Sequence, residues 1–253
     1  MKIDENWAEV GVHIADVSYF VRPGSALDEE AANRGTTVYL CGKRIDMVPG
    51  LLSSNLCSMR DDGDRLAFSV VWEVNYHTGE IRTYSFHKSI VRSRKSLTYG
   101  EAQLMIDDPS QNCDITTGLR GLNSLAKIFK KKRIEKGSLT LSSPEVRFHI
   151  DSETHDPIDL QTKQLKETNS MVEEFMLLAN VTVAEHIEKE FPECAVLRRH
   201  PTPPASNFDS LVFAARTRGI EMNVSSSKSL ADTLDEAKIE GDDYRRVFLK
   251  CHI

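Results

Sequence analysis

Three aspartates lie close together in the segment Asp61-Asp62-Gly63-Asp64 and are candidates for a catalytic metal site. Enzymes that cut phosphate esters use grouped carboxylates to hold a pair of metal ions, about 4 Å apart, that activates water. The segment lies, however, in a polar loop before a predicted strand, where Asp and Gly are common turn formers. We therefore favour a turn over a metal site here.

His13 and Asp16 form a second ionisable pair, within the apolar run Val12-His13-Ile14-Ala15-Asp16-Val17. A carboxylate among apolar neighbours needs partners, and such positions are often functional. The alternative, that Asp16 caps the next turn, fits the sequence equally well. Motifs of the GxSxG, HExxH, P-loop and GxGxxG kinds are absent from the sequence, which argues against those hydrolase, zincin and nucleotide-binding classes. The five cysteines are scattered and never spaced as CxxC, which argues against a disulfide framework and a zinc site.

The charge of the chain is uneven. Its 32 Lys and Arg residues against 38 Asp and Glu give a net charge of −6, which by itself attracts neither nucleic acid nor anionic lipid. Between Arg82 and Arg147, however, 13 basic residues stand against six acidic ones. The densest basic cluster is Lys127, Lys130, Lys131, Lys132, Arg133 and Lys136. Cations at a helix end usually form a solvated face; a ridge that contacts phosphates is the alternative.

No segment approaches the roughly 20 apolar residues of a membrane helix, and the first residues lack the layout of a signal peptide. We therefore expect a cytosolic or nuclear chain that has no membrane partner.

Hydrophobic periodicity predicts a sheet followed by helices. Val10, Val12 and Ile14 alternate as in a strand, and the alternating run Leu66–Tyr76, followed by a turn and by Ile81–Val91, predicts a long hairpin. The predicted strands are 10–15, 36–40, 66–76, 81–91, 146–150 and 158–160. The predicted helices are 97–106, a longer one from Asp114 or Thr116 to Arg133, 166–190 and 206–218, with stops at Gly137 and Gly219. The third of these helices should bury Phe175, Met176 and Ala179. The fold class is therefore α+β.

An ordered series of motifs resembles the RNB catalytic domain of the RNase II/RNase R family. The motifs are HIADVS (13–18), RGTTVYL (34–40), MVP (47–49), LLSSNLCSM (51–59), DRLAFS (64–69), LTLSSPE (139–145) and MVEEFMLLAN (171–180). Within this family, Tyr39-Leu40-Cys41 and the segment Lys43–Pro49 are most similar to the branch of the exoribonuclease of the eukaryotic RNA exosome.

The resemblance implies an RNB-type fold, an antiparallel sheet packed with helices. It also implies processive 3′-to-5′ hydrolysis of single-stranded RNA to nucleoside monophosphates with Mg²⁺. Exosome core subunits are the implied partners, and the nucleus or nucleolus is the implied location, with the cytoplasm as an alternative. Residues 1–237 are expected to form a partial RNB domain, incomplete at both ends, and residues 238–253 a divergent or truncated end.

Two family motifs have no match in the sequence. The Asp-Ile-Asp-Asp segment that binds metal in the family belongs to the strand before HIADVS, and the Ser-Pro-Ile-Arg-Arg-Tyr segment belongs downstream. Tyr244-Arg245-Arg246 is only a superficial echo of the second motif. We therefore expect that no catalytic or metal-binding residue of the family lies in this chain, that it holds no Mg²⁺ by itself, and that it is inactive alone. The alternative is a non-catalytic module that binds RNA or the exosome.

Four residues inherit roles from the resemblance. Tyr39 matches a tyrosine that stacks on bases at the RNA 3′ end, although most strand tyrosines merely bury their ring. Glu174 or its neighbour Glu173 matches a helix carboxylate near the terminal nucleotide, where it could accept from the 2′-hydroxyl. We prefer Glu174, although adjacent helix glutamates are ordinarily surface residues. Asp16 is expected to orient the neighbouring metal-binding strand of the family.

Overall fold

The computed structural model describes residues 3–40, 43–138, 146–150, 157–162, 165–199, 201, 203–217 and 219–236. The chain forms two compact units. The first contains the described residues up to Ala126 and those from Phe148 to Thr182, and the second contains the other described residues. The LTLSSPE motif, the turn between the predicted strands 146–150 and 158–160, the segment 238–253 and Tyr244–Arg246 lie outside the described residues. The expected boundary after residue 237 stays a prediction.

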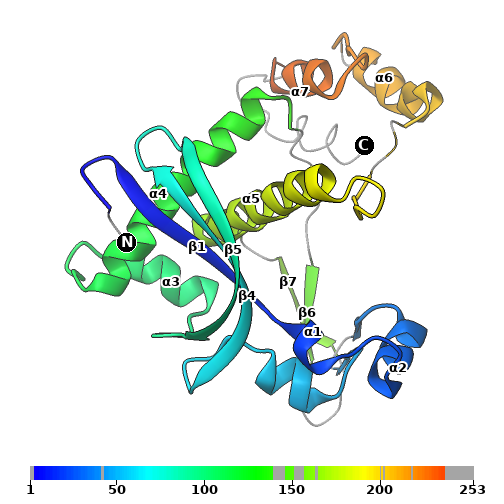
Figure 1. Cartoon of the computed structure of the whole chain (residues 1–253). Helices are drawn as coiled ribbons and strands as arrows, with labels where there is room; N and C mark the ends of the chain where they lie inside the picture. Colours follow the sequence, from blue (N-terminus) through cyan, green and yellow to red (C-terminus); the bar gives the residue numbers. More distant parts are fainter. Residues whose placement is uncertain are drawn as a thin grey trace. The chain divides into compact units, whose positions relative to one another are not determined.

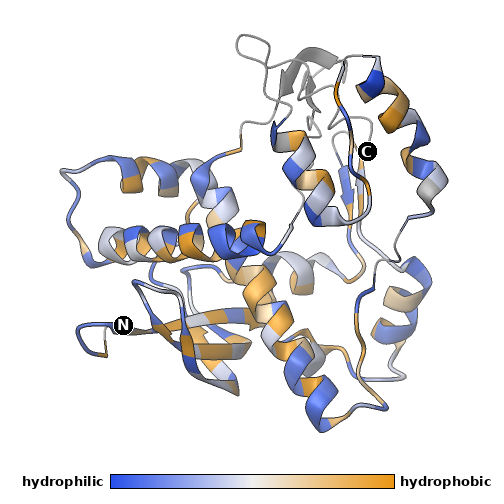
Figure 2. Ribbon diagram, turned by 90° about the horizontal axis from the view of Figure 1, so that it is seen from above, coloured by the Kyte–Doolittle hydropathy of each residue, from blue (hydrophilic) through white to orange (hydrophobic). Residues whose placement is uncertain are grey.

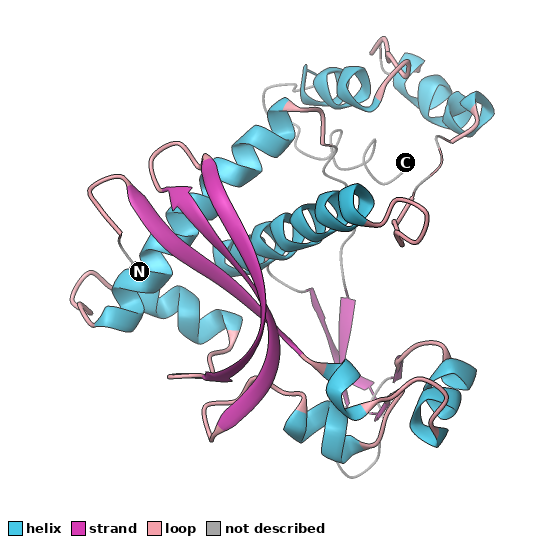
Figure 3. Cartoon of the chain, viewed as in Figure 1, coloured by secondary structure: helices cyan, strands magenta, loops and turns pink. Residues whose placement is uncertain are grey.

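The first unit contains a three-stranded antiparallel sheet (Figures 1 and 3). Its strands are β1 (Trp7–Ala15), β4 (Asp64–Asn75) and β5 (Ile81–Arg92), in the order β1-β4-β5. The turn between β4 and β5 contains Gly79 at φ 64°, a left-handed conformation that glycine adopts without strain. The predicted first strand and the predicted long hairpin are both confirmed.

One face of this sheet is buried and apolar. The strand register pairs Val10 with Trp72 and Val12 with Val70, so that these side chains point to the same side of the sheet. Trp72 and Val74 are fully buried, and Val70 nearly so. The indole N–H of Trp72 donates to the hydroxyl of Thr182 at 3.1 Å. This hydrogen bond fixes the helix that carries Thr182 against the sheet.

Three helices of the first unit are tied together by polar contacts. They are α3 (Tyr99–Asp107) and the portions of α4 (Asp114–Glu135) and α5 (Glu167–Glu190) that belong to this unit. Arg120 of α4 donates to the carbonyl oxygen of Ile106 at 3.1 Å and to that of Asp108 at 2.6 Å, at the end of α3. Thr168 of α5 donates to the carbonyl oxygen of Tyr99 at 2.9 Å. The carbonyl groups at both ends of α3 therefore find side-chain donors.

Five short elements lie between β1 and β4 in the chain. They are α1 (Val17–Phe20), α2 (Ala26–Arg34), β2 (Val38–Leu40), β3 (Lys43–Ile45) and the π-helix η1 (Leu52–Leu56). Periodicity predicted only β2, because elements of three to nine residues are too short to show a clear repeat. The side chain of Ser25 caps α2, and Gly35 at φ 71° ends it.

The second unit contains the ends of α4 and α5, with η2 (Ala205–Phe208), α6 (Asp209–Arg216) and α7 (Ser227–Glu236). Its apolar cluster is made by four buried residues, Leu211, Ala215, Leu230 and Leu234. Gly137 at φ 94° follows α4, and Gly219 at φ 73° follows α6, so both predicted stops are confirmed. A Cβ at Gly137 would lie 2.8 Å from Cβ of Lys228, so the chain passes too close to α7 for any larger residue.

The α+β prediction is confirmed by the antiparallel strands and by the helices that follow them in the chain. β6 (Val146–Ile150) and β7 (Pro157–Thr162) form the second predicted hairpin as a separate two-stranded sheet. Figure 2 shows hydrophobic and hydrophilic residues interspersed along the helices. Within the described residues, no helix combines the length and the apolar character needed to cross a membrane.

The buried side of α5 differs from the predicted one at Met176. Phe175 and Ala179 are buried as expected, but Met176 is 53% exposed. Thr168, Thr182 and Glu174 are buried instead. Polar residues occupy the buried stripe because Thr168 and Thr182 make hydrogen bonds to the neighbouring elements, and hydrophobic periodicity does not detect such positions.

The hydrogen bond between Trp72 and Thr182 gives a test of the sheet–helix contact. Replacing Thr182 by Val keeps the shape of the side chain but leaves the indole N–H buried without its acceptor. We expect Thr182→Val to lower the free energy of unfolding by about 1–3 kcal/mol, measured by urea denaturation. The exposed neighbour Val181 gives the control Val181→Thr, which should change stability by less than about 0.5 kcal/mol. Equal effects of the two variants would contradict this role of Thr182.

Candidate nucleic-acid interface

Tyr39 lies on a small hairpin with its ring open to solvent. Strands β2 and β3 pair in antiparallel register, with Tyr39 opposite Arg44 and Leu40 opposite Lys43. Tyr39 is 77% exposed, which is unusual for an aromatic residue on a strand. Cross-strand partners point to the same face of a ribbon, so Arg44 and the ring of Tyr39 share a face. The structure therefore presents an accessible aromatic ring beside a guanidinium group.

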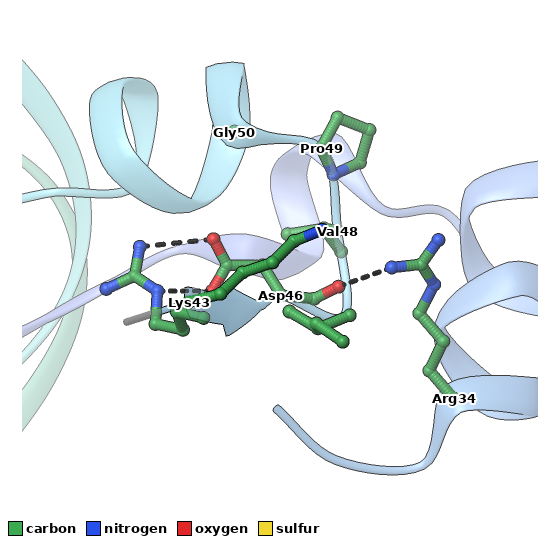
Figure 4. A pocket seen from close by; sticks show the side chains of 8 residues that line it. Arg34, Lys43, Asp46, Val48, Pro49 and Gly50 are labelled. Carbon is green, nitrogen blue, oxygen red and sulfur yellow. Dashed lines mark hydrogen bonds and ion pairs between the residues drawn. The ribbon is translucent and has the colours of Figure 1, made fainter. Parts of the chain in front are cut away.

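Asp46 holds the guanidinium of Arg44 in place with both of its carboxylate oxygens. Figure 4 labels Asp46 and draws its contacts as dashed lines. Oδ1 of Asp46 lies 2.7 Å from Nε of Arg44, and Oδ2 accepts from Nη2 of Arg44 at 3.1 Å. Oδ2 also accepts from the hydroxyl of Ser53 at 2.8 Å, and Nη2 of Arg44 donates to the hydroxyl of Ser54 at 3.0 Å. The hydroxyl of Ser53 and the charge of Arg44 lower the pKa of Asp46. The carboxylate is therefore ionised, and it connects the hairpin to η1.

Arg34 connects the same residue to α2. Its Nη1 donates to the backbone carbonyl oxygen of Asp46 at 2.8 Å, while its Nε pairs with Oε1 of Glu30 at 2.8 Å. Gly35 turns the chain from α2 towards the hairpin. Asp46 thus joins α2, β3 and η1 through its side chain and its backbone. Arg44 and Asp46 belong to the family-like segment Lys43–Pro49, but the sequence alone assigned them no role. The available signal was their spacing, since residues two apart on a strand share a face.

Asp16 lies at the end of β1 and is also held by partners. It is 7% exposed. Its Oδ1 accepts from the hydroxyl of Ser18 at 2.6 Å, and its Oδ2 lies 3.0 Å from Nζ of Lys88 on β5. The hydrogen bond from Ser18 and the ammonium of Lys88 lower the pKa of Asp16. Burial, aided by the charge of Asp16, raises the pKa of the Cys57 thiol, so the residue after η1 lies near this carboxylate.

The two glutamates of α5 occupy different environments. Glu174 is 3% exposed and lies beside the buried residues Met171 and Phe175, whereas Glu173 is exposed. Spacing alone could not separate the two residues, and the structure shows that Glu174 is on the packed side of the helix. Tyr39, Glu174 and Asp16 belong to three different elements of the first unit, a hairpin, a helix and a strand end. Their assigned roles stay predictions.

The aspartates at 61, 62 and 64 make structural contacts. Asp62 pairs with Arg60 and Arg65, and Asp64 pairs with Nε of Arg92 at 2.7 Å. Oδ2 of Asp61 accepts from the backbone N–H of Ser96 at 3.1 Å. Asp61 and Asp64 therefore join the start of β4 to residues 92–96, and Asp62 makes contacts within its own turn. In the part of the chain that the structure describes, no group of three or more His, Cys, Asp or Glu residues is arranged to hold a metal ion. These residues do not fit an Mg²⁺ site.

His13 faces β4 rather than Asp16. Its Nδ1 lies 2.6 Å from Oγ of Ser69, which lies 2.6 Å from Oγ of Ser89, so a polar chain crosses all three strands of the sheet. Partial burial lowers the pKa of His13. At neutral pH the imidazole is therefore neutral and acts as one member of a hydrogen-bonded row.

The basic cluster at 127–136 lies on the last turns of α4 and just beyond it. Lys127, Lys131, Lys132 and Lys136 are exposed, and Nζ of Lys131 lies 4.0 Å from Oε1 of Glu135. This placement agrees with a solvated helix face and equally with a ridge that contacts phosphates. Both alternatives stay open.

Comparisons with known proteins assign the fold to a family. The model of the RNB domain matches residues 1–251. The exosome complex exonuclease RRP44 of Homo sapiens is 66% identical over 242 residues, which are 96% of this chain and 25% of that protein. The exosome complex exonuclease dis3 of Schizosaccharomyces pombe is 50% identical over 243 residues, again 96% of this chain and 25% of that protein. The chain thus spans about a quarter of the length of these relatives.

Solved structures agree with this assignment. The structure of Mycoplasma genitalium RNase R in complex with ribose methylated single-stranded RNA matches with a TM-score of 0.86 and 25% identity, over 98% of this chain and 40% of that chain. Yeast Ssd1, described as a pseudonuclease, matches with a TM-score of 0.77 and 21% identity, over 99% of this chain and 30% of that chain. The second likeness shows the fold alone. The predicted RNB-type fold is confirmed.

The ion pair of Asp16 predicts a pH dependence of stability. Because the folded state lowers the pKa of Asp16 below the unfolded value of about 3.9, the stabilisation is present above that pH and is lost as the pH falls through the folded pKa. We expect Lys88→Gln to lower the urea midpoint at pH 7, and the difference from the parent chain to shrink at pH 3 and below. Lys166→Gln, at an exposed lysine, is the matched control. A difference that is the same at both pH values would contradict the pairing.

Proposed function

This chain belongs to the RNB domain family, and we propose that it binds the 3′ end of single-stranded RNA as part of a 3′-to-5′ exoribonuclease domain of the exosome type. The observation that carries the proposal is the exposed ring of Tyr39 on a hairpin fixed by Arg44 and Asp46. Stacking of a base on an aromatic ring contributes roughly 1–3 kcal/mol and tolerates any sequence. Such a grip suits an enzyme that shortens RNA processively to nucleoside monophosphates.

Glu174 is proposed to recognise the ribose of the terminal nucleotide. An ionised carboxylate can accept a hydrogen bond from a 2′-hydroxyl, which DNA lacks. The support is the position of Glu174 in the family motif at 171–180 and its place on the packed side of α5, where water competes little for the carboxylate. Glu173 projects into solvent and serves as a comparison.

Asp16 is proposed to act as a positioning residue at the end of β1. Its carboxylate fixes the end of this strand to β5 through Lys88 and to the following turn through Ser18. In the family the metal-binding acids belong to a strand next to β1. A fixed end of β1 would therefore hold that neighbouring strand in position. Divalent metal is general in the family, and we propose that the carboxylates for Mg²⁺ come from outside these 253 residues, since the described ones do not fit such a site.

The proposed partners are single-stranded RNA and the exosome core, in the nucleus or nucleolus or in the cytoplasm. The support is the likeness to proteins named exosome complex exonuclease and to an RNase R that was solved with single-stranded RNA. The second candidate, a non-catalytic module that binds RNA or the exosome, is favoured by the lack of a metal-binding group among the described residues. A hydrolysis assay separates the exoribonuclease from the non-catalytic module only in a protein that also contains the metal-binding acids of the family.

Removing the ring of Tyr39 tests the proposed grip. We expect Tyr39→Ala to weaken the binding of a 5′-labelled single-stranded RNA by 1–3 kcal/mol, about 5- to 150-fold, in fluorescence anisotropy. Tyr39→Phe keeps the ring and should bind like the parent chain. Equal affinities for the Ala and Phe variants would show that the ring does not stack on RNA.

Neutralising Glu174 tests the reading of the ribose. We expect Glu174→Gln to reduce the preference for an oligonucleotide with a 3′-terminal ribose over one with a deoxyribose by about tenfold, because a hydrogen bond to a charged acceptor is lost. Glu173→Gln should leave the preference unchanged. A loss of thermal stability in Glu174→Gln without a change in sugar preference would instead indicate a purely structural carboxylate.

Hydrolysis by residues 1–253 is the direct test of the proposed origin of the metal ligands. We expect labelled RNA incubated with this chain and Mg²⁺ to be bound but not shortened, because its described residues do not fit a metal site. A ladder of shortened products that a chelator abolishes would overturn this expectation. If Asp62→Asn removed that ladder, the aspartates at 61, 62 and 64 would be its source.

A further inference from the structure

A pocket of about 360 Å³ lies beside the hairpin that carries Tyr39. It is lined by Arg34 at the end of α2, by Lys43 and Arg44 of β3, and by Asp46 with the turn that follows it. Figure 4 shows Arg34 next to Asp46, with Lys43 extending across the pocket. Three cationic side chains from two elements thus converge on one open cavity.

The charges in this pocket do not cancel. Asp46 balances Arg44, and Glu30 balances Arg34, each through contacts of 2.8 Å or less. Lys43 makes no ion pair with any residue that the structure describes. The pocket therefore keeps one positive charge in excess. An anion could enter without displacing an existing carboxylate, because each carboxylate already has its own arginine.

Arg44 also has hydrogen-bond donors to spare. A guanidinium carries five N–H groups. Nε and one N–H of Nη2 point to Asp46, and Nη2 also donates to Ser54. The two N–H groups of Nη1 find no acceptor within the described portion of the chain. A planar donor group that is already fixed in orientation loses little entropy when it binds, and its geometry suits phosphate oxygens.

We infer that this pocket binds one phosphodiester of the RNA strand whose terminal base stacks on Tyr39, an inference that rests on the proposed function. Arg44 is the cross-strand partner of Tyr39, and the Cβ atoms of such partners lie about 5 Å apart. The phosphate of a nucleotide stacked on the ring of Tyr39 therefore comes within reach of the pocket. Lys43 supplies the mobile charge, Arg44 the oriented donors, and Asp46 is the positioning residue that fixes Arg44.

The salt dependence of RNA binding measures the contribution of Lys43. For single strands, each neutralised phosphate adds about 0.7 to the slope of log affinity against log salt. We expect Lys43→Gln to weaken the binding of a 5′-labelled ten-nucleotide RNA about fivefold at low salt and to reduce this slope by about 0.7. Lys95→Gln removes an exposed charge outside the pocket and is the matched control.

A modified RNA locates the phosphate. Single phosphodiesters near the 3′ end are replaced in turn by neutral methylphosphonates. We expect one position at which the Lys43→Gln variant and the parent chain bind the modified RNA with equal affinity. On the same RNA, Tyr39→Ala should still weaken binding as much as it does on unmodified RNA. A pocket for free inorganic phosphate or for an acidic peptide would show no such position, and that result would overturn the inference.

Asp46 is tested by non-additivity. Arg44→Lys keeps the charge but loses the planar donors, and Asp46→Asn releases the guanidinium. We expect the double variant to bind RNA no more weakly than Arg44→Lys alone, because Asp46 acts only through Arg44. Melting temperatures show whether each variant is folded, and Lys43→Gln, at an exposed position, serves where Asp46→Asn does not fold. Additive losses would contradict the positioning role.

The controls separate the failure of the inference from that of the proposed function. If Tyr39→Ala loses affinity while Lys43→Gln and Arg44→Lys keep the parent affinity and salt slope, the pocket does not bind the strand and the proposed function stands. If Tyr39→Ala binds RNA like the parent chain, or if the parent chain binds none, both are wrong.

Discussion

The short hairpin of β2 and β3 cannot hold its shape by its own hydrogen bonds, and this constraint governs the region around Tyr39. A two-stranded ribbon is marginal in water even with longer strands, and here each strand has three residues. Asp46 supplies the missing support, because its carboxylate binds Arg44 and Ser53 while its backbone carbonyl binds Arg34. An exposed ring on a braced hairpin has less freedom to lose than a ring on a free loop.

The main sheet supports the second part of the site by the same means. β1 is followed directly by the buried carboxylate of Asp16, which would be costly without partners. Lys88 reaches Asp16 from β5 although β4 lies between the two strands. Ser18 and Lys88 both favour the ionised form of Asp16. The end of β1 is therefore fixed at every pH at which Asp16 is charged. Asp46 and Asp16 thus both orient the residues around them. The aspartates at 61, 62 and 64 instead make ion pairs and hydrogen bonds around the start of β4.

The sequence predicted the long elements well because their patterns are repetitive. The alternation from Leu66 to Tyr76 and the stripe of α4 each extend over several repeats, and glycines at 137 and 219 marked the helix ends. The small elements between β1 and β4 have no repeat, so only β2 was predicted among them. The exposure of Met176 was not foreseen, and the preference for Glu174 over Glu173 came from the family motif and not from periodicity, since a carboxylate on the packed side of a helix follows from tertiary partners and not from hydrophobicity. Resemblance drew attention to Tyr39, but only the structure revealed the arginine and aspartate that brace its hairpin.

All of the proposed RNA contacts depend on the RNA 3′ end lying on the Tyr39 hairpin. Photocrosslinking measures this directly: an RNA that ends in 4-thiouridine is bound to the chain and irradiated, and the attached peptide is identified by mass spectrometry. The account predicts that the terminal nucleotide attaches to the peptide that contains Tyr39. Attachment instead to the basic cluster at 127–136, with none at the hairpin, would contradict it.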